Sequence, residues 1–320
     1  MADLALALTM AVWGSSFALL RYFLSGDGDP SRAAAPLGVL ALRMAFASTL
    51  LGLFLLARRL VRPARPRFTF AQLRALLRDG IVCGLLLGLG FLLQTEGLQR
   101  TTASRSGFLT GLLVAFVPIL EFLLYKKRPA PPALAGLLLA FAGMAVLSGP
   151  FASGPTGLGD LLTVGCALVF AGHILALARA APRQPLLELL LCQLVCVGLL
   201  AALVGPLVDD ARLPRDPRLL LAVIYLALFA TLFAFGVQVW AQRRVAPVRI
   251  ALLSSLEPLF AAGFAALLLG ERLQRREWVG GASIVAGVLV GEVGSALASR
   301  GKPLSADAPA ASNPPIERRW

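Results

Sequence analysis

The sequence has little charge for its length. Only 15% of its 320 residues are charged, 58% are hydrophobic, and the mean hydropathy is +0.80. A soluble domain usually has about a quarter of its residues charged, so this composition excludes an ordinary soluble fold. We expect an all-α integral membrane protein, because open strands would leave backbone groups unpaired in hydrocarbon.

Histidine and cysteine are also scarce. The chain has one histidine, and its four cysteines fall inside apolar runs without the paired spacing of a zinc site (Cys83, Cys166, Cys192 and Cys196). It has no phosphate-binding loop and no clustered aspartate pair in a long loop, so it offers little from which to build a membrane-embedded transferase. We therefore expect no metal, no cofactor and no enzymatic activity.

The net charge of +13 is better explained by membrane topology than by a nucleic-acid partner. Basic residues lie mostly between the apolar runs rather than along one solvent-facing element. They are more frequent in loops expected on the side of the N-terminus, such as 58–78, 126–128 and 243–249. The positive-inside rule then places both termini in the cytoplasm of a bacterial inner membrane. Residues 299–320 lack periodicity and predict a disordered cytoplasmic tail.

Ten apolar runs are long enough to be transmembrane helices. They are bounded by arginine, proline and glycine, and lie near residues 3–24, 36–57, 80–98, 104–124, 132–149, 158–178, 185–206, 218–240, 247–269 and 277–298.

An internal repeat relates the two halves of the chain. A constant shift of 144 residues superimposes the third to fifth runs on the eighth to tenth without gaps, and places Gln94 on Gln238. The repeats span 3–149 and 158–298 with five helices each. An odd number of helices inverts the second copy in the membrane, which is the plan of secondary transporters with a site near the midplane. The repeat favours alternating access, although a pore could have the same plan.

A second shift, of 157 residues, relates the first helix of each repeat. It places Trp13 on Phe170 and Ser16 on His173. Trp13 and Ser16 flank Gly14, and a turn with small residues allows helices to approach closely. Trp13 is either a cavity-lining ring or a packing residue. Gln94 and Gln238 either line a solute site from both repeats or join helices by hydrogen bonds.

From about residue 3 to residue 298, the chain resembles the EamA group of the drug/metabolite transporter superfamily. The resemblance rests on AVWGSSF (11–17), ALRMAFA (41–47), TTASRSGFLTGLLVAFVPIL (101–120), GDLLTVGCALVFAGH (159–173), LLSSLEPLFAAGFAALLLGERL (252–273) and the GGASIVAGVLV that follows (280–290). It implies ten helices as two inverted five-helix repeats. It also implies a transporter of metabolites such as amino acids and their relatives, or of drugs.

We therefore expect a secondary transporter, with export as the expected direction, that moves small organic metabolites such as amino acids or drugs by alternating access. The alternative is a passive pore or membrane scaffold. The expected partners are a small-molecule substrate and the lipid bilayer, and both proton coupling and a homodimer are left open. The prolines Pro118 and Pro258 are predicted helix breaks, which favour a moving carrier.

Glu257 is the clearest candidate for a functional group. It lies ten residues into its apolar run, about 15 Å from either surface at 1.5 Å per residue, and directly precedes Pro258. A charge at that depth needs a partner or a watery cavity. It either couples protons or binds a substrate amine, or else it accepts hydrogen bonds from backbone loosened by the helix break. Ser254 lies three residues earlier on the same helical face and is its expected cavity partner.

Two further ionisable side chains lie inside apolar runs. Arg43 is about 10 Å below the outer start of its run. It pairs either with Glu257, with an anionic substrate, or with structural carboxylates and carbonyls. His173 titrates near neutral pH in its ordinary state and could couple protons. Its alternative role is a hydrogen bond between two helices.

Overall fold

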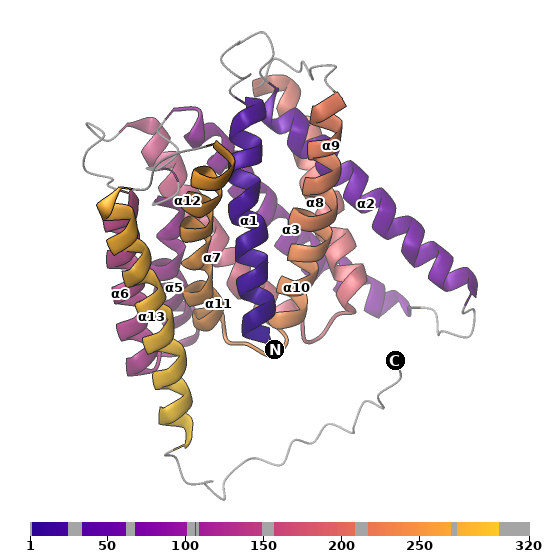
Figure 1. Cartoon of the computed structure of the whole chain (residues 1–320). Coiled ribbons are helices and arrows are strands. Elements are labelled where there is room, and N and C mark those ends of the chain that lie inside the picture. Colours follow the sequence, from indigo (N-terminus) through magenta and orange to yellow (C-terminus); the bar gives the residue numbers. More distant parts are fainter. Residues whose placement is uncertain are drawn as a thin grey trace, which may run out of the picture.

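The computed structural model consists of packed helices (Figure 1). It describes residues 2–24, 34–61, 68–100, 106, 109–148, 157–208, 217–269 and 274–300, and these contain no strand. The helices are α1 (Ala2–Leu24), α2 (Pro36–Val61), α3 (Phe70–Leu98), α5 (Leu113–Tyr125), α6 (Pro131–Ser148), α7 (Leu158–Ala180), α8 (Leu186–Val208), α9 (Pro217–Tyr225), the π-helix η4 (Leu226–Phe233), α10 (Ala234–Ala241), α11 (Pro247–Ser254), α12 (Leu256–Leu269) and α13 (Arg275–Arg300).

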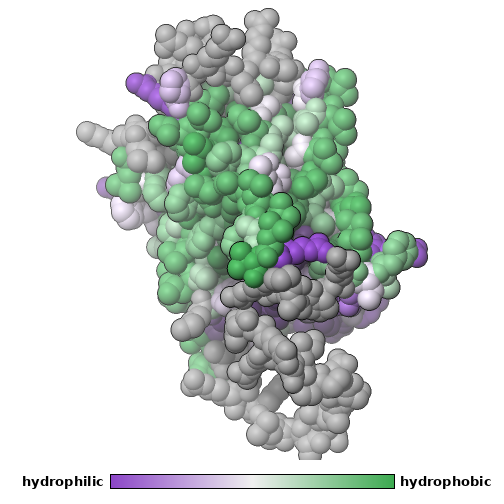
Figure 2. Space-filling view, turned by 90° about the vertical axis from the view of Figure 1, so that its right-hand side faces the viewer, coloured by the Kyte–Doolittle hydropathy of each residue, from purple (hydrophilic) through white to green (hydrophobic). Residues whose placement is uncertain are grey.

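Seven of the described helical segments are long and apolar enough to cross a membrane. They are Pro36–Val61, Phe70–Leu98, Leu158–Ala180, Leu186–Val208, Pro217–Ala241, Pro247–Phe264 and Arg275–Gly294, and shorter apolar helices cover Leu109–Tyr125 and Pro131–Leu147. Most of the coloured residues in Figure 2 are hydrophobic, and the hydrophilic residues among them form only small groups. The chain is therefore a multi-pass membrane protein.

Local sequence explains where several helices begin. The first residue of α2, α6, α9 and α11 is a proline (Pro36, Pro131, Pro217 and Pro247), which suits a first turn whose N–H groups have no intrahelical acceptor. Helix α3 begins ten residues before the predicted 80–98 run, because Thr69 and Gln72 form a reciprocal capping box that starts the helix outside the apolar stretch.

The predicted run at 247–269 contains a helix break. A turn at Ser255 separates α11 from α12, and its backbone N–H bonds to the carbonyl of Leu252 at 3.2 Å. Pro258 is the third residue of α12, in the first turn, where a missing N–H is tolerated.

The break predicted at Pro118 was wrong. Helix α5 continues through Pro118, and the helical turn is instead interrupted at Leu112. Shifted by 144 residues, Leu112 falls one residue after Ser255, so the two repeats break at nearly the same place. The prolines were misleading because both follow this common position, Pro118 six residues after Leu112 and Pro258 three residues after Ser255.

The predicted tail lies mostly outside the described residues. Helix α13 continues to Arg300, and residues 301–320 are not among those described.

Helices α6 and α13 are packed closely along their length (Figure 1). Glycines lie at the closest points of this contact: a methyl group added at Gly287 would lie 2.7 Å from the Gly136 carbonyl oxygen, and one added at Gly143 would lie 2.8 Å from the Gly280 oxygen. Such close backbone approach requires residues without side chains. The shift of 144 residues places Gly136 on Gly280 and Gly143 on Gly287, so the two contacts are equivalent.

The remaining helices pack in corresponding pairs. The contact between α1 and α12 corresponds to the contact between α7 and α5 in the other half of the chain. In the same way, the contact between α3 and α7 corresponds to the contacts that η4 and α10 make with α1. Helix α3 also contacts α8, as η4 contacts α2, and α2 packs directly on α8. One hydrophobic cluster gathers around α5, α6, α7, α11 and α13, and a second around α2, α3, α8 and α10. Phe170 packs against both.

Candidate functional site

Three helices meet at the carbonyl oxygen of Ala230, in the middle of the Pro217–Ala241 segment. Trp13 Nε1 of α1 donates a hydrogen bond to this oxygen at 3.0 Å, and Arg43 Nη2 of α2 donates another at 3.0 Å. Ala230 belongs to the π-helix η4, and Thr231 beside it donates from Oγ1 to the carbonyl of Leu226, five residues back, at 2.9 Å. π-Helical turns are rare and occur frequently at functional sites. The Ala230 carbonyl therefore links α1, α2 and η4.

Arg43 is buried and its partners are neutral. Its Nε donates to Thr231 Oγ1, and its guanidinium lies 5.8 Å from the centroid of the Phe91 ring. Among the described residues it forms no ion pair with Glu257 or any other carboxylate. The pairing with Glu257 considered above is thus absent, because the π-helix offers Arg43 a hydroxyl and a carbonyl instead.

Four aromatic rings form a row beside Arg43. Trp13 and Phe235 have centroids 5.2 Å apart, Phe235 and Phe91 6.2 Å, and Phe91 and Phe170 5.6 Å. The shift of 144 residues places Phe91 on Phe235, and that of 157 places Trp13 on Phe170. Exchanging the repeats therefore exchanges the two inner rings with each other and the two outer rings with each other. The prediction had singled out only Trp13, although the repeat alignment contained the other three rings.

Glu257 and Ser254 lie on either side of the break between α11 and α12. Glu257 is half-buried and forms no ion pair among the described residues. Ser254 Oγ donates to the carbonyl of Ile250 at 2.9 Å. The turn at Ser255 means that Ser254 and Glu257 do not share one continuous helical face as the sequence spacing predicted.

His173 forms a buried hydrogen bond between helices. Its Nε2 lies 2.9 Å from Gln193 Oε1 of α8, and Gln193 Nε2 donates to the carbonyl of Leu189 at 3.3 Å. This geometry is that of the alternative role considered for His173, a helix-to-helix hydrogen bond. Of the two equivalent glutamines, Gln238 is buried and Gln94 is half-buried. Gln238 Oε1 has no hydrogen-bond partner among the described residues.

Two serines near the tryptophan form hydrogen bonds. Ser16 Oγ donates to the carbonyl of Trp13 at 2.7 Å, and Ser15 Oγ lies 2.6 Å from the hydroxyl of Tyr225. The contact between Ser15 and Tyr225 joins α1 to α9 immediately before the π-helix. Sequence reasoning did not single out Tyr225 or Thr231, because a lone polar residue in an apolar run is not distinctive.

A group of charges lies at the end of the molecule where α1 begins. Arg249 Nη2 of α11 is 2.9 Å from Asp3 Oδ2 of α1, and it also pairs with Glu292 Oε2 of α13. The carboxylate oxygens Asp3 Oδ1 and Glu292 Oε1 are buried without a described partner. This cluster, Asp3–Arg249–Glu292, joins three helices at one end of the molecule.

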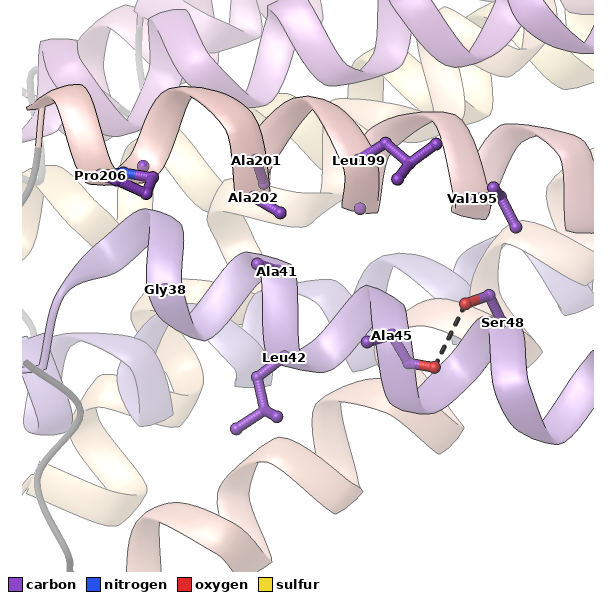
Figure 3. A pocket seen from close by; sticks show the side chains of 12 residues that line it. Gly38, Ala41, Leu42, Ala45, Ser48, Val195, Leu199, Ala201, Ala202 and Pro206 are labelled. Carbon is purple, nitrogen blue, oxygen red and sulfur yellow. Dashed lines mark hydrogen bonds between the residues drawn. The ribbon is translucent and has the colours of Figure 1, made fainter. Parts of the chain in front are cut away.

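The groove between α2 and α8 is not a polar site. Its volume is about 520 Å³, and it is lined by small and apolar side chains such as Ala41, Leu42 and Leu199 (Figure 3). The hydroxyl of Ser48 donates to the carbonyl of Ala45 at 3.2 Å within its own helix. None of the predicted site residues lines this groove, so the polar residues that could recognise a solute lie elsewhere, around Ala230 and Glu257.

A multi-pass helical molecule with buried polar groups and an aromatic row that joins four helices has the character of a membrane transporter. The EamA-like transporter family matches the chain twice, over residues 1–149 and 157–291. The chain belongs to this family.

Relatives with known names are consistent with this assignment. Two proteins of Archaeoglobus fulgidus, each named "Uncharacterized transporter", are 29% and 28% identical to the chain over 289 and 296 residues. The alignments cover 90% and 89% of this chain, and 85% and 95% of those proteins. A protein of Salmonella typhimurium named "Probable amino-acid metabolite efflux pump" is 28% identical over 210 residues, which cover 62% of this chain and 68% of that protein.

A solved crystal structure has the same fold. It is 20% identical in sequence, with a TM-score of 0.72, and the match covers 91% of this chain and 98% of the other. At this level of identity the likeness concerns the fold alone. The chain is thus a membrane transporter by family, with a small molecule as substrate.

Proposed function

We propose that the protein is a ten-span secondary transporter that exports small organic metabolites, such as amino acids or drugs, across a bacterial inner membrane by alternating access. The observation that carries this proposal is the double match of one transporter family to the two halves of the chain. The domains proposed are the repeats 3–149 and 158–298, followed by a cytoplasmic tail. The efflux-pump name of the Salmonella relative supports export of an amino-acid metabolite.

Helix packing supports the inverted repeat. In the repeat alignment, α1 corresponds to α7, and α5 corresponds to α11 and α12. The contact between α1 and α12 therefore has its equivalent in the contact between α7 and α5. Helices α6 and α13 contact each other through glycines that exchange in pairs, and so do the four rings of the aromatic row. Such contacts are expected if one half is the other turned over in the membrane.

The central residues supply the substrate and proton pathway in this proposal. Trp13, Arg43 and Ser16 contribute from the first repeat together with Gln94, and His173, Gln238, Ser254 and Glu257 contribute from the second. The break between α11 and α12 supports movement, because the two short helices can change their mutual angle at Ser255. With the N-terminus in the cytoplasm, the Asp3–Arg249–Glu292 cluster lies at the inner end and would have to separate when the site opens inward.

A counterflow experiment tests the proposal against the passive pore. Purified protein is reconstituted in liposomes loaded with an unlabelled amino-acid metabolite, and a trace of the labelled compound is added outside. A carrier accumulates the label transiently against its gradient, because exchange is faster than net flux, whereas a pore only equilibrates it. We expect saturable counterflow for at least one member of a panel of amino acids and their derivatives. Equilibration without overshoot for every solute that crosses would establish the pore.

A screen in cells tests the direction of flux. Bacteria that overexpress the chain are grown on inhibitory concentrations of the same metabolites. An exporter protects cells against its own substrate, and an importer sensitises them. Sensitisation would therefore contradict export while leaving the carrier mechanism intact.

A further inference from the structure

The guanidinium of Arg43 is a buried cation in a membrane-spanning helix whose described partners are all neutral. Its side chain and backbone are together only 5% exposed. A guanidinium has five N–H donors, and two of them bond here, one to the Thr231 hydroxyl and one to the Ala230 carbonyl. Buried charges are ordinarily paired with an opposite charge. Within the described segments, no carboxylate lies within ion-pair distance of Arg43.

The second repeat shows that this position does not require a charge. The buried residues of α2 recur on α8 at a shift of 150 residues, which places Arg43 on Gln193. The matching sets are Val39, Leu40, Arg43, Met44, Ala47 and Leu51 on α2, and Leu189, Leu190, Gln193, Leu194, Val197 and Ala201 on α8. Gln193 joins its neighbours through hydrogen bonds to His173 and Leu189. A neutral side chain is therefore sufficient to tie the helices together at this place.

The surroundings hold the guanidinium in one orientation. Thr231 Oγ1 bonds Nε while its own proton goes to the Leu226 carbonyl, and the Ala230 carbonyl that accepts from Nη2 is also held by Trp13. The Phe91 ring lies against the guanidinium at 5.8 Å. Trp13 and Phe91 are half-buried, so the molecule is not completely closed beside Arg43. The remaining N–H groups are thus oriented before any ligand arrives, which lowers the entropic cost of binding.

From these observations we infer that Arg43 binds an anionic group of the transported solute, so that the substrates carry a carboxylate or a comparable oxyanion. A planar guanidinium bonds two carboxylate oxygens at once, and it gains most where water is excluded. The charge that the described residues leave unpaired is then neutralised by the solute. This inference rests on the proposed transport function and specifies its substrate class.

Matched solutes that differ only in charge test the inference. The probes are N-acetyl-alanine, N-acetyl-leucine and N-acetyl-phenylalanine, each paired with its C-terminal amide, which keeps the shape and removes the anion. Binding to the purified protein in detergent is measured from the ligand-induced rise in melting temperature, because a ligand that binds only the folded state stabilises it. We expect at least one carboxylate to bind roughly tenfold or more tightly than its amide.

Two variants of Arg43 test whether this side chain causes the preference for the carboxylate over the amide. Arg43→Gln copies the neutral residue of the second repeat and should remove the preference, whereas Arg43→Lys keeps the charge without the planar fork and should retain part of it. Arg244→Gln removes a guanidinium that bonds to the Trp240 carbonyl and lies over the Trp240 ring, and it should leave the preference unchanged. If Arg43→Gln does not fold, the comparison of Arg43→Lys with the wild type decides the point.

The outcomes separate the inference from the proposed function. The anion site is overturned if none of the three pairs shows a carboxylate preference. It is also overturned if the preference survives in Arg43→Gln, or if it is equal in Arg43→Lys and the wild type. Counterflow of an acid and its amide at equal rates overturns it too, while transport stands. Carboxylate binding that depends on Arg43, without counterflow of any solute, supports the site and contradicts the transporter.

Discussion

Phe91 and Phe235 lie 144 residues apart in sequence, the length of one repeat shift, and touch each other in space. Their centroids are 6.2 Å apart and their planes cross at 84°, an edge-to-face contact. If the halves are inverted repeats, as proposed above, a contact between equivalent residues lies near the axis that relates them. In that arrangement the aromatic row is centred between the repeats, with Trp13 and Phe170 at its ends.

We expect the two central rings to be energetically coupled. Aromatic pairs contribute about 0.5–1.5 kcal/mol beyond burial, so Phe91→Leu and Phe235→Leu should show a coupling of that size in a double-mutant cycle. The measurement is unfolding of the purified protein in mixed micelles. Phe54, which is 55% exposed on α2, provides the control pair: Phe54→Leu combined with Phe91→Leu should show coupling near zero. Equal coupling in both cycles would contradict a specific contact.

Glycine contacts between α6 and α13 lead to a second prediction. A methyl group at Gly287 would lie 2.5 Å from the Ala140 backbone nitrogen, so the helices must separate in Gly287→Ala. We expect a loss of about 1–3 kcal/mol, the usual cost of overpacking. Gly263→Ala is the matched control, because a methyl group at Gly263 meets nothing within 4 Å. It should be neutral or stabilising by up to about 1 kcal/mol, since alanine favours helix. Similar melting temperatures for the two variants would exclude close packing at Gly287.

Much of the architecture could be predicted because lipid leaves the chain few choices. A long apolar run must become a helix, and the shift of 144 residues pairs positions that the structure uses in equivalent contacts, such as Gly136 with Gly280. The prediction was wrong where a residue type was taken to determine backbone geometry. Pro118 does not break its helix, and no proline marks the π-helix Leu226–Phe233.

The surroundings of the candidate site were harder to predict. Arg43 was recognisable as a buried charge, but its partners are a backbone carbonyl and the hydroxyl of Thr231. A carbonyl is present at every residue, so sequence cannot say which one is available to a distant arginine. The rings of Phe91 and Phe235 could have been found, because the repeat alignment places one on the other.

The Asp3–Arg249–Glu292 cluster gives a third prediction. Arg249 is 45% exposed and Asp3 is 41% exposed, so the pair should contribute only a few tenths to about 1 kcal/mol. The reversals Asp3→Arg and Arg249→Asp should each lower the melting temperature, because each brings like charges together. The double variant restores opposite charges and should recover most of the loss. Arg244→Gln serves as the control for loss of a positive charge outside the cluster. A double variant less stable than both single variants would exclude a direct pair.

His173 should stabilise the fold without setting the pH dependence of transport. Gln193→Leu leaves His173 Nε2 without its described partner, and hydrogen bonds between membrane helices average about 0.6 kcal/mol with a maximum near 1.7. We expect a stability loss in this range for Gln193→Leu. His173→Gln should leave the pH profile of transport unchanged, because the histidine is used as a helix-to-helix hydrogen bond. A shifted pH profile in His173→Gln would assign it to proton coupling instead.

Glu257 is expected to carry the coupling proton. It is half-buried, adjoins the break between α11 and α12, and has no ion pair among the described residues, so its charge is free to change with the state of the transporter. Glu257→Gln keeps the size and hydrogen-bonding capacity of the side chain but cannot exchange a proton. It should abolish solute movement driven by a pH gradient in proteoliposomes while leaving counterflow intact, because counterflow requires no net proton transfer.

The control variant is Glu121→Gln, which neutralises a half-buried glutamate four residues before the end of α5. It should retain gradient-driven movement. Three results can be distinguished for Glu257→Gln. Loss of gradient-driven movement alone assigns the proton to Glu257, and unchanged movement contradicts that role. Loss of both activities together with a lower melting temperature means instead that the carboxylate stabilises the broken helix, which was the structural alternative recognised from its position beside Pro258.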